Sequence, residues 1–172
     1  MSDFARLAAA RYSERHFDPE KLPEKEKIRS IAEAARLAPT ATNAQAFHMY
    51  LIGPEKGKAL LPEVTRCYFK APYHILLCAD HSQSWVRSYD DFDAAELDLG
   101  IVGSHIALQA QDLGLHSCFI CAFDPAACRK CFELPEEHEP IMLIALGYAS
   151  KDSEPSPRHK ERKALAEVLS EV

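Results

Sequence analysis

The chain has 172 residues, of which 47% are hydrophobic and 27% are charged. This length fits a single domain over residues 1–172. We expect residues 150–172 to form an extended C-terminal tail. The formal net charge of −6 disfavours a nucleic-acid binder, because affinity for a polyanion depends on clustered cations. No apolar stretch approaches the ~20 residues of a membrane span, and the first residues lack the basic and apolar regions of a signal peptide, so we expect a cytoplasmic protein that does not bind membranes.

The first expected helix covers residues 3–12, with the apolar side chains of Phe4, Leu7 and Ala8 on its inner face. Arg11, Ser13 and Arg15 follow at and just beyond its end. The planar arginine side chain has parallel donors and a permanent charge, which suit a phosphate or a carbonyl edge.

A second helix is expected over residues 23–38, with Pro23 in its first turn, and Pro39 ends it. The loop that follows has no large side chain and carries hydroxyls and amides, namely Thr40, Thr42, Asn43 and Gln45. Amides both donate and accept hydrogen bonds, so they suit a heterocycle edge that alternates C=O and N–H, such as the flavin pyrimidine ring. Composition alone favours the simpler interpretation, a polar connector between a helix and a strand.

Three apolar runs are expected to be strands: Phe47–Ile52, His74–Ala79 and Pro140–Ala149. The second and third are continuously apolar, which is typical of strands buried on both faces. A short helix is expected between the first two, at residues 55–66. Strands of this kind among helices predict a layered α/β or α+β architecture.

Residues 80–90 form a polar loop that holds Trp85, the only tryptophan. This side chain could cover a substrate pocket or simply pack on the surface. The longest periodic segment, residues 91–113, is expected to be a buried helix, and Gly100 and Gly103 would let another helix approach it closely.

A further strand is expected from Ser117, before a helix capped by Asp124 with a proline at its first position. Two CxxC pairs occur in this region, formed by Cys118, Cys121, Cys128 and Cys131. They could make a thiol- or metal-binding regulatory module. The gap of six residues between the pairs is shorter than in paired-CxxC zinc sites, so we expect no metal and favour ordinary packing.

Two motifs, in this order, resemble the nitroreductase family of FMN-dependent oxidoreductases: Arg11-x-Ser13-x-Arg15 and Pro39-Thr40-x-x-Asn43-x-Gln45. The late Pro-x-x-x-x-x-Leu-Gly-Tyr strand, which ends at Tyr148, and the Lys160-x-Arg162 element extend the resemblance to nearly the whole chain. There is no G-x-G-x-x-G phosphate loop, which disfavours a Rossmann dehydrogenase.

The resemblance implies an α+β nitroreductase-like fold, with a central mostly antiparallel or mixed sheet flanked by helices. It also implies an intertwined homodimer with FMN at the subunit interface. NAD(P)H would deliver hydride to flavin N5, and a small acceptor (a nitroaromatic, quinone or enone) would then receive it in a ping-pong cycle. No catalytic side chain is implied, because FMN carries the chemistry. Related flavin chemistry, such as dehalogenation or flavin destruction, is an alternative on the same fold.

The resemblance also assigns roles to residues of this chain. Phosphate contacts are expected from Arg11, Lys160 and Arg162, and contacts to the ribityl chain or pyrimidine edge from Ser13, Arg15, Asn43 and Gln45. Tyr12 lies within the first motif. Pro39, Thr40 and Ala41 are expected to touch the ring from a neighbouring subunit. Phe119, Cys121 and Ala122 would line the pocket, where a backbone N–H donates to N5; a glycine is frequent in the family where this chain has Cys121 or Ala122.

Overall fold

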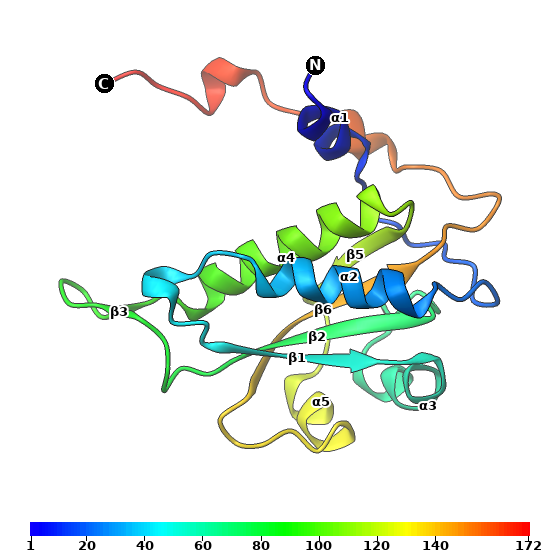
Figure 1. Cartoon of the computed structure of the whole chain (residues 1–172), viewed down its shortest axis with the longest axis horizontal. Coiled ribbons are helices and arrows are strands. Elements are labelled where there is room, and N and C mark those ends of the chain that lie inside the picture. The colour runs from blue at the N-terminus through cyan, green and yellow to red at the C-terminus, as the bar shows by residue number, and fades with distance from the viewer.

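The computed structural model describes residues 1–172 and is built on a four-stranded sheet (Figure 1). The strands lie in the order β1 (Phe47–Ile52), β2 (Tyr73–Ala79), β6 (Glu139–Gly147) and β5 (His116–Ile120), and every pair is antiparallel. The expected α+β class and largely antiparallel sheet are therefore confirmed. All three predicted apolar runs form strands, because β-branched and other apolar residues suit a sheet covered on both faces.

Two helices cover each face of the sheet (Figure 1). On one face, α2 (Lys25–Arg36) and α4 (Ala95–Asp112) enclose a cluster of 14 buried hydrophobic residues. On the other, α3 (Pro54–Val64) and α5 (Pro125–Cys131) enclose a cluster of 13. β2 and β6 contribute to both clusters, so the centre of the sheet joins the two halves of the core.

The helix α1 (Asp3–Ala10) lies outside these layers, beside the C-terminal tail (Figure 1). It buries no residue, and Phe4 is 64% exposed. The expected burial of the inner face is therefore wrong for a single chain, since the contact of α1 with α4 leaves Phe4 and Ala8 exposed and Leu7 only half-buried. The tail has two short 3-10 helices, Pro157–Lys160 and Leu165–Glu167, and is mostly exposed from residue 154 onward.

Two helices begin later than the sequence predicted, α2 and α4. The backbone at Glu24 is still extended, with ψ of 140°, so α2 begins at Lys25 and Pro23 lies before the helix instead of in its first turn. The long helix begins at Ala95 because residues just before it close a small hairpin of β3 (Val86–Arg87) and β4 (Phe92–Asp93).

The two glycines of α4 have different surroundings. A Cβ at Gly103 would lie 2.8 Å from Cε1 of Phe119, whereas one at Gly100 would meet nothing within 4 Å. Gly103 thus allows α4 to approach β5, a strand where we expected a second helix. None of the helices combines the length and apolar character that a membrane span requires.

Candidate functional site

The first motif borders the free edge of β5. Ser13 forms a parallel bridge with Ser117, and the Glu14 N–H donates to the Ser117 carbonyl oxygen at 3.0 Å. Ser117 therefore directs its backbone groups away from β6. Because this direction alternates along a strand, the N–H group of Phe119 also faces the free edge.

Glu14 is the centre of this part of the site, and no sequence pattern predicted this role. Its side chain is 1% exposed, and its carboxylate accepts hydrogen bonds from the Tyr12 hydroxyl at 2.9 Å and from the backbone N–H groups of Arg15 and His16 at 2.8 and 2.6 Å. The Ser153 hydroxyl, from the tail, lies 2.7 and 2.6 Å from its two oxygens. Burial opposes ionisation, but the hydrogen bonds from Ser153, His16, Tyr12 and Arg15 outweigh it and lower the pKa of Glu14. A carboxylate thus ties the motif to the tail.

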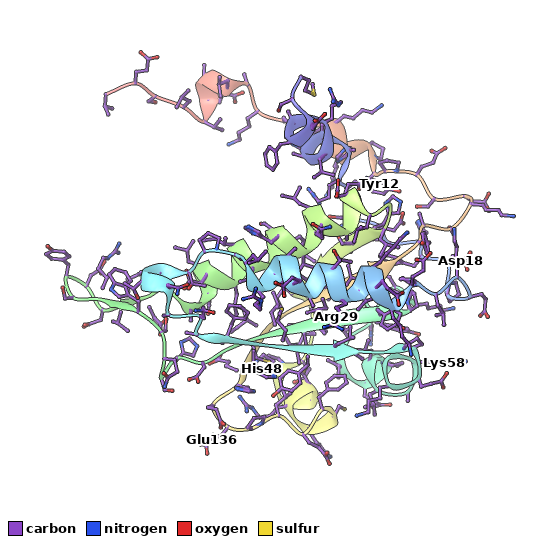
Figure 2. The ribbon with its side chains drawn as sticks, in the orientation of Figure 1. Tyr12, Asp18, Arg29, His48, Lys58 and Glu136 are labelled. Carbon is purple, nitrogen blue, oxygen red and sulfur yellow. The ribbon has the colours of Figure 1, made fainter.

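The tail also reaches the end of α1. Nε2 of His159 lies 3.0 Å from the carbonyl oxygen of Ala9, and its ring centroid is 6.0 Å from that of Tyr12. Figure 2 shows Tyr12 where α1 approaches the C-terminal end of α4. Arg11 precedes Tyr12 in the chain and Lys160 follows His159, so the structure brings the front of the chain and its tail together. Arg162 donates to the carbonyl oxygen of Glu161 at 2.6 Å, so its guanidinium bonds to its own segment.

The second motif forms a strained loop at the other end of α4. A 3-10 turn spans Ala41–Asn43, and three residues of the loop have left-handed φ values: Thr42 at 52°, Asn43 at 57° and Gln45 at 52°. Such values are uncommon outside glycine, and for a β-branched threonine they are costly. Pro39, Asn43 and Gln45 are exposed, and Thr40 accepts a hydrogen bond from the Gln45 N–H at 3.0 Å.

The buried carboxylate of Asp98 fastens this loop to the first turn of α4. Its two oxygens lie 3.0 and 3.1 Å from the Ala41 nitrogen. No pattern in the sequence singled out Asp98.

The two motifs lie at opposite ends of α4 within one chain (Figure 1). The helix spans ~21 Å from Asp98 to Asp112 at 1.5 Å per residue, and β5 follows it directly. Phe119 packs against Gly103 between the two ends. Ala122 lies beyond β5, where its carbonyl oxygen accepts a hydrogen bond from the Thr65 hydroxyl at 2.5 Å, and its neighbour Cys121 is exposed.

The cysteines do not form a ligand cluster. All six are free, and no group of three or more His, Cys, Asp and Glu side chains is arranged to hold a metal ion. Burial raises the pKa of Cys78 and of Cys128 to about 12 and raises that of Cys118 as well. These thiols therefore stay protonated and fit the packing role. Trp85 lies in the β3–β4 hairpin and is 37% exposed.

Comparisons with known proteins agree with this arrangement. The family model described as "Nitroreductase family" matches residues 8–73 and 65–148. A crystal structure of a nitroreductase family protein from Clostridium difficile 630 has 37% identity and a TM-score of 0.89, covering 99% of this chain and 98% of that one. An FMN-dependent nitroreductase from Clostridium difficile R20291 shares the fold at 23% identity and a TM-score of 0.71, covering 91% and 96%.

A sequence relative comes from Methanothermobacter thermautotrophicus. Its name proposes an NADH dehydrogenase or NAD(P)H nitroreductase. It is 26% identical over an alignment of 162 residues, and the match covers 87% of this chain and 79% of the relative. The matched family model spans most of the chain, and both motifs lie inside the matched residues. The chain therefore belongs to the nitroreductase family.

Proposed function

We propose that this protein is an FMN-dependent NAD(P)H oxidoreductase of the nitroreductase type that binds FMN between the two chains of a homodimer. When bound, FMN would take hydride from NAD(P)H at N5 and pass it to a small acceptor, a nitroaromatic, quinone or enone, in a ping-pong cycle. The names of the Clostridium difficile R20291 and Methanothermobacter proteins support FMN and NAD(P)H, respectively.

The observation that carries the proposal is the meeting of the first motif and the tail beside the edge of β5. Arg11 and Lys160 are brought to the same end of α4 by the His159–Ala9 contact, and no acidic side chain forms an ion pair with either cation. Two cations at one place suit a single phosphate. The neighbouring N–H groups on the free edge of β5 supply neutral donors suited to a flavin ring.

The loop at the other end of α4 supports the pyrimidine contacts. Asn43 and Gln45 are exposed, and their backbones are held in a conformation that costs free energy. Strain of this kind persists where the surroundings over-determine it, and it clusters at functional sites. The amides would pair with the C=O and N–H groups of the ring edge.

A second copy of the chain would bring the two groups of candidate FMN-binding residues together, the first motif of one chain and the Thr40–Gln45 loop of the other. Within one chain, Arg15 and Asn43 lie at opposite ends of α4, too far apart to contact the same ring edge. The surface around α1, α4 and the tail is also apolar: Phe4 is 64% exposed, Leu97 58% and Leu165 70%. A groove of about 630 Å³ between α1 and α4, with Ile101 and Leu108 in its lining, would accept a partner's side chains.

The test is the visible spectrum of the purified protein with added FMN. We expect bands near ~370 and ~450 nm that bleach with NAD(P)H, as for any oxidised flavoprotein. The variant Lys160→Ala should weaken FMN binding by about tenfold through loss of a charge-assisted contact. Lys151→Ala, on the same tail, is the matched control. A protein that binds no FMN at micromolar concentration, or an equal effect of both variants, would contradict the proposal.

A further inference from the structure

Asp98 is a buried carboxylate with an unusually small set of partners. It is 4% exposed and lies in the first turn of α4. Both of its oxygens face one donor, the N–H of Ala41, and it takes part in no ion pair. The N-terminus of the helix favours its charge, but burying a carboxylate with one N–H partner still costs free energy. Its presence is therefore poorly explained by stability alone.

Asp98 is also not the cap of its own helix. The N-cap of α4 is Ala94, which makes no side-chain hydrogen bond, and it is Asp93 that accepts a hydrogen bond from the Ala95 N–H. Asp98 instead contacts a residue 57 positions earlier in the chain. Its carboxylate acts on the loop.

The loop has no other side-chain hydrogen bond to the rest of the molecule. Thr40 bonds to Gln45, the Thr42 hydroxyl donates to Ala41, and the Gln45 amide donates to Asn43. The backbone hydrogen bonds of these residues also stay local, as from Asn43 to Thr40. Internal bonds alone do not set the position of the loop on the body, and its three left-handed residues hold it in a strained conformation. The Asp98–Ala41 contact is the hydrogen bond that joins residues 40–45 to the rest of the molecule, and the next one along the chain runs from the Asp80 N–H to the Ala46 carbonyl oxygen, just beyond the loop.

We propose that Asp98 is a positioning residue of the cofactor site: it holds the Thr40–Gln45 loop against α4 so that the Asn43 and Gln45 amides meet the flavin edge. This inference rests on the proposed function. Asp98 touches the loop backbone and acts on the flavin through it.

Three variants test the role. Asp98→Ala removes the acceptor, and Asp98→Asn keeps one oxygen that can accept from Ala41. Glu96→Gln removes an exposed charge from the same turn of α4, with no hydrogen bond to the loop, and is the matched control. The measurements on the full-length protein are hydrogen exchange of the Ala41 amide without FMN, the FMN dissociation constant from fluorescence quenching, and the visible spectrum with FMN bound.

We expect Asp98→Ala to expose the Ala41 amide to exchange, to weaken FMN binding by about tenfold (~1.4 kcal/mol) and to shift the visible flavin band. Asp98→Asn should rescue FMN binding to within about threefold of the unmodified protein, because an amide oxygen still accepts the hydrogen bond. Glu96→Gln should match the unmodified protein in all three measurements.

Unchanged FMN affinity and spectrum in Asp98→Ala would overturn the inference. So would an equal loss in Asp98→Ala and Asp98→Asn in proportion to lowered thermal stability, since that result describes a structural residue. If the unmodified protein itself binds no FMN, the proposed function fails. If it binds FMN and Asp98→Ala binds it equally well, only the present inference fails.

Discussion

The segments that meet at the C-terminal end of α4 and those that meet at its N-terminal end are held by different kinds of contact. At its C-terminal end, Glu14 collects hydrogen bonds from the first motif and from Ser153 of the tail, and the same segment bridges to Ser117 on the edge of the sheet. Three stretches far apart in the sequence converge there. At its N-terminal end, the Thr40–Gln45 loop satisfies itself internally and is fastened to the helix by Asp98 alone.

Because of this difference, substitutions at the two ends of α4 should affect different properties, the stability of the protein at one end and ligand binding at the other. The C-terminal end cannot open without breaking contacts of the sheet edge and the tail, so changes there should act on the free energy of unfolding. The loop can shift with few other contacts broken, so changes there should act first on ligand binding. Regions with few long-range contacts are those that open locally.

The largest effect is expected from Glu14→Ala. Removing the carboxylate leaves buried donors without an acceptor, and breaking a buried charged network costs about 3–5 kcal/mol. Urea unfolding measures this loss. Ser153→Ala, which removes a single donor, should cost about 1 kcal/mol. A loss from Glu14→Ala no larger than that from Asp98→Ala would break the contrast between the two ends.

His74, in β2 of the sheet, should make the stability of the protein fall at acidic pH. This side chain is fully buried, its Nε2 lies 2.9 Å from the Tyr68 carbonyl oxygen, and its Nδ1 has no partner. Burial lowers the pKa of His74 to about 4. The unfolded chain therefore binds a proton between pH ~6.5 and ~4 that the folded protein does not, so stability falls as the pH falls through this window.

Urea unfolding at pH 7 and pH 5 should differ by about 2 kcal/mol from this group. The variant His74→Leu removes the titrating group and should flatten that part of the profile, even if it is less stable at pH 7. An unchanged slope in the variant would show that His74 is not the acid-sensitive group.

Alanine substitutions of the two glycines of α4 test the packing around the middle of this helix. Gly103→Ala should cost about 1–3 kcal/mol, because its Cβ would meet Phe119 at 2.8 Å. Gly100→Ala meets no atom of its own chain and should gain up to about 1 kcal/mol of helix propensity if that face is solvent-exposed. Weakened dimerisation of Gly100→Ala in sedimentation would instead indicate that a second copy covers this face.

The smallest effect is expected at the hairpin beside the loop. His81 bonds to Asp93 at 2.8 Å and lies 3.2 Å from Glu139, and the hydrogen bond to Asp93, with the charges of Asp93, Glu139 and Glu96, raises the pKa of His81. The stabilisation of the folded protein by this interaction is complete below the pKa that His81 has in the unfolded chain. It is lost as the pH rises through the pKa of His81 in the folded protein. Because the side chain is 40% exposed, solvent screening keeps it below about 1 kcal/mol.

Trypsin cleavage after Arg87, normalised to a short peptide substrate at each pH, should therefore speed up from pH 6 to pH 8.5. His81→Gln should abolish this pH dependence. Cleavage that keeps the same dependence in the variant would contradict a role for His81 in holding the hairpin.

Much of the fold followed from local patterns. The runs at His74–Ala79 and Pro140–Ala149 predicted buried strands because their apolar character is continuous, and both are confirmed. The spacing of Ile28, Ile31, Ala32 and Ala35 predicted the inner face of α2; Ile28, Ile31 and Ala35 are buried, and Ala32 is half-buried. Both motifs also identified the family. The FMN contacts assigned to them stay predictions, since they depend on a ligand and a second chain.

The sequence by itself determined the strands of the main sheet, the approximate extent of the five α-helices and the residues that carry the family motifs, because periodicity and motif spacing are local properties of the chain. Only the tertiary structure decided that Glu14 and Asp98 are buried, that Phe4 is not, and that the two motifs lie at opposite ends of α4. A charged residue is normally exposed, and its burial depends on donors supplied by segments tens of residues away. That information exists only once the chain has folded.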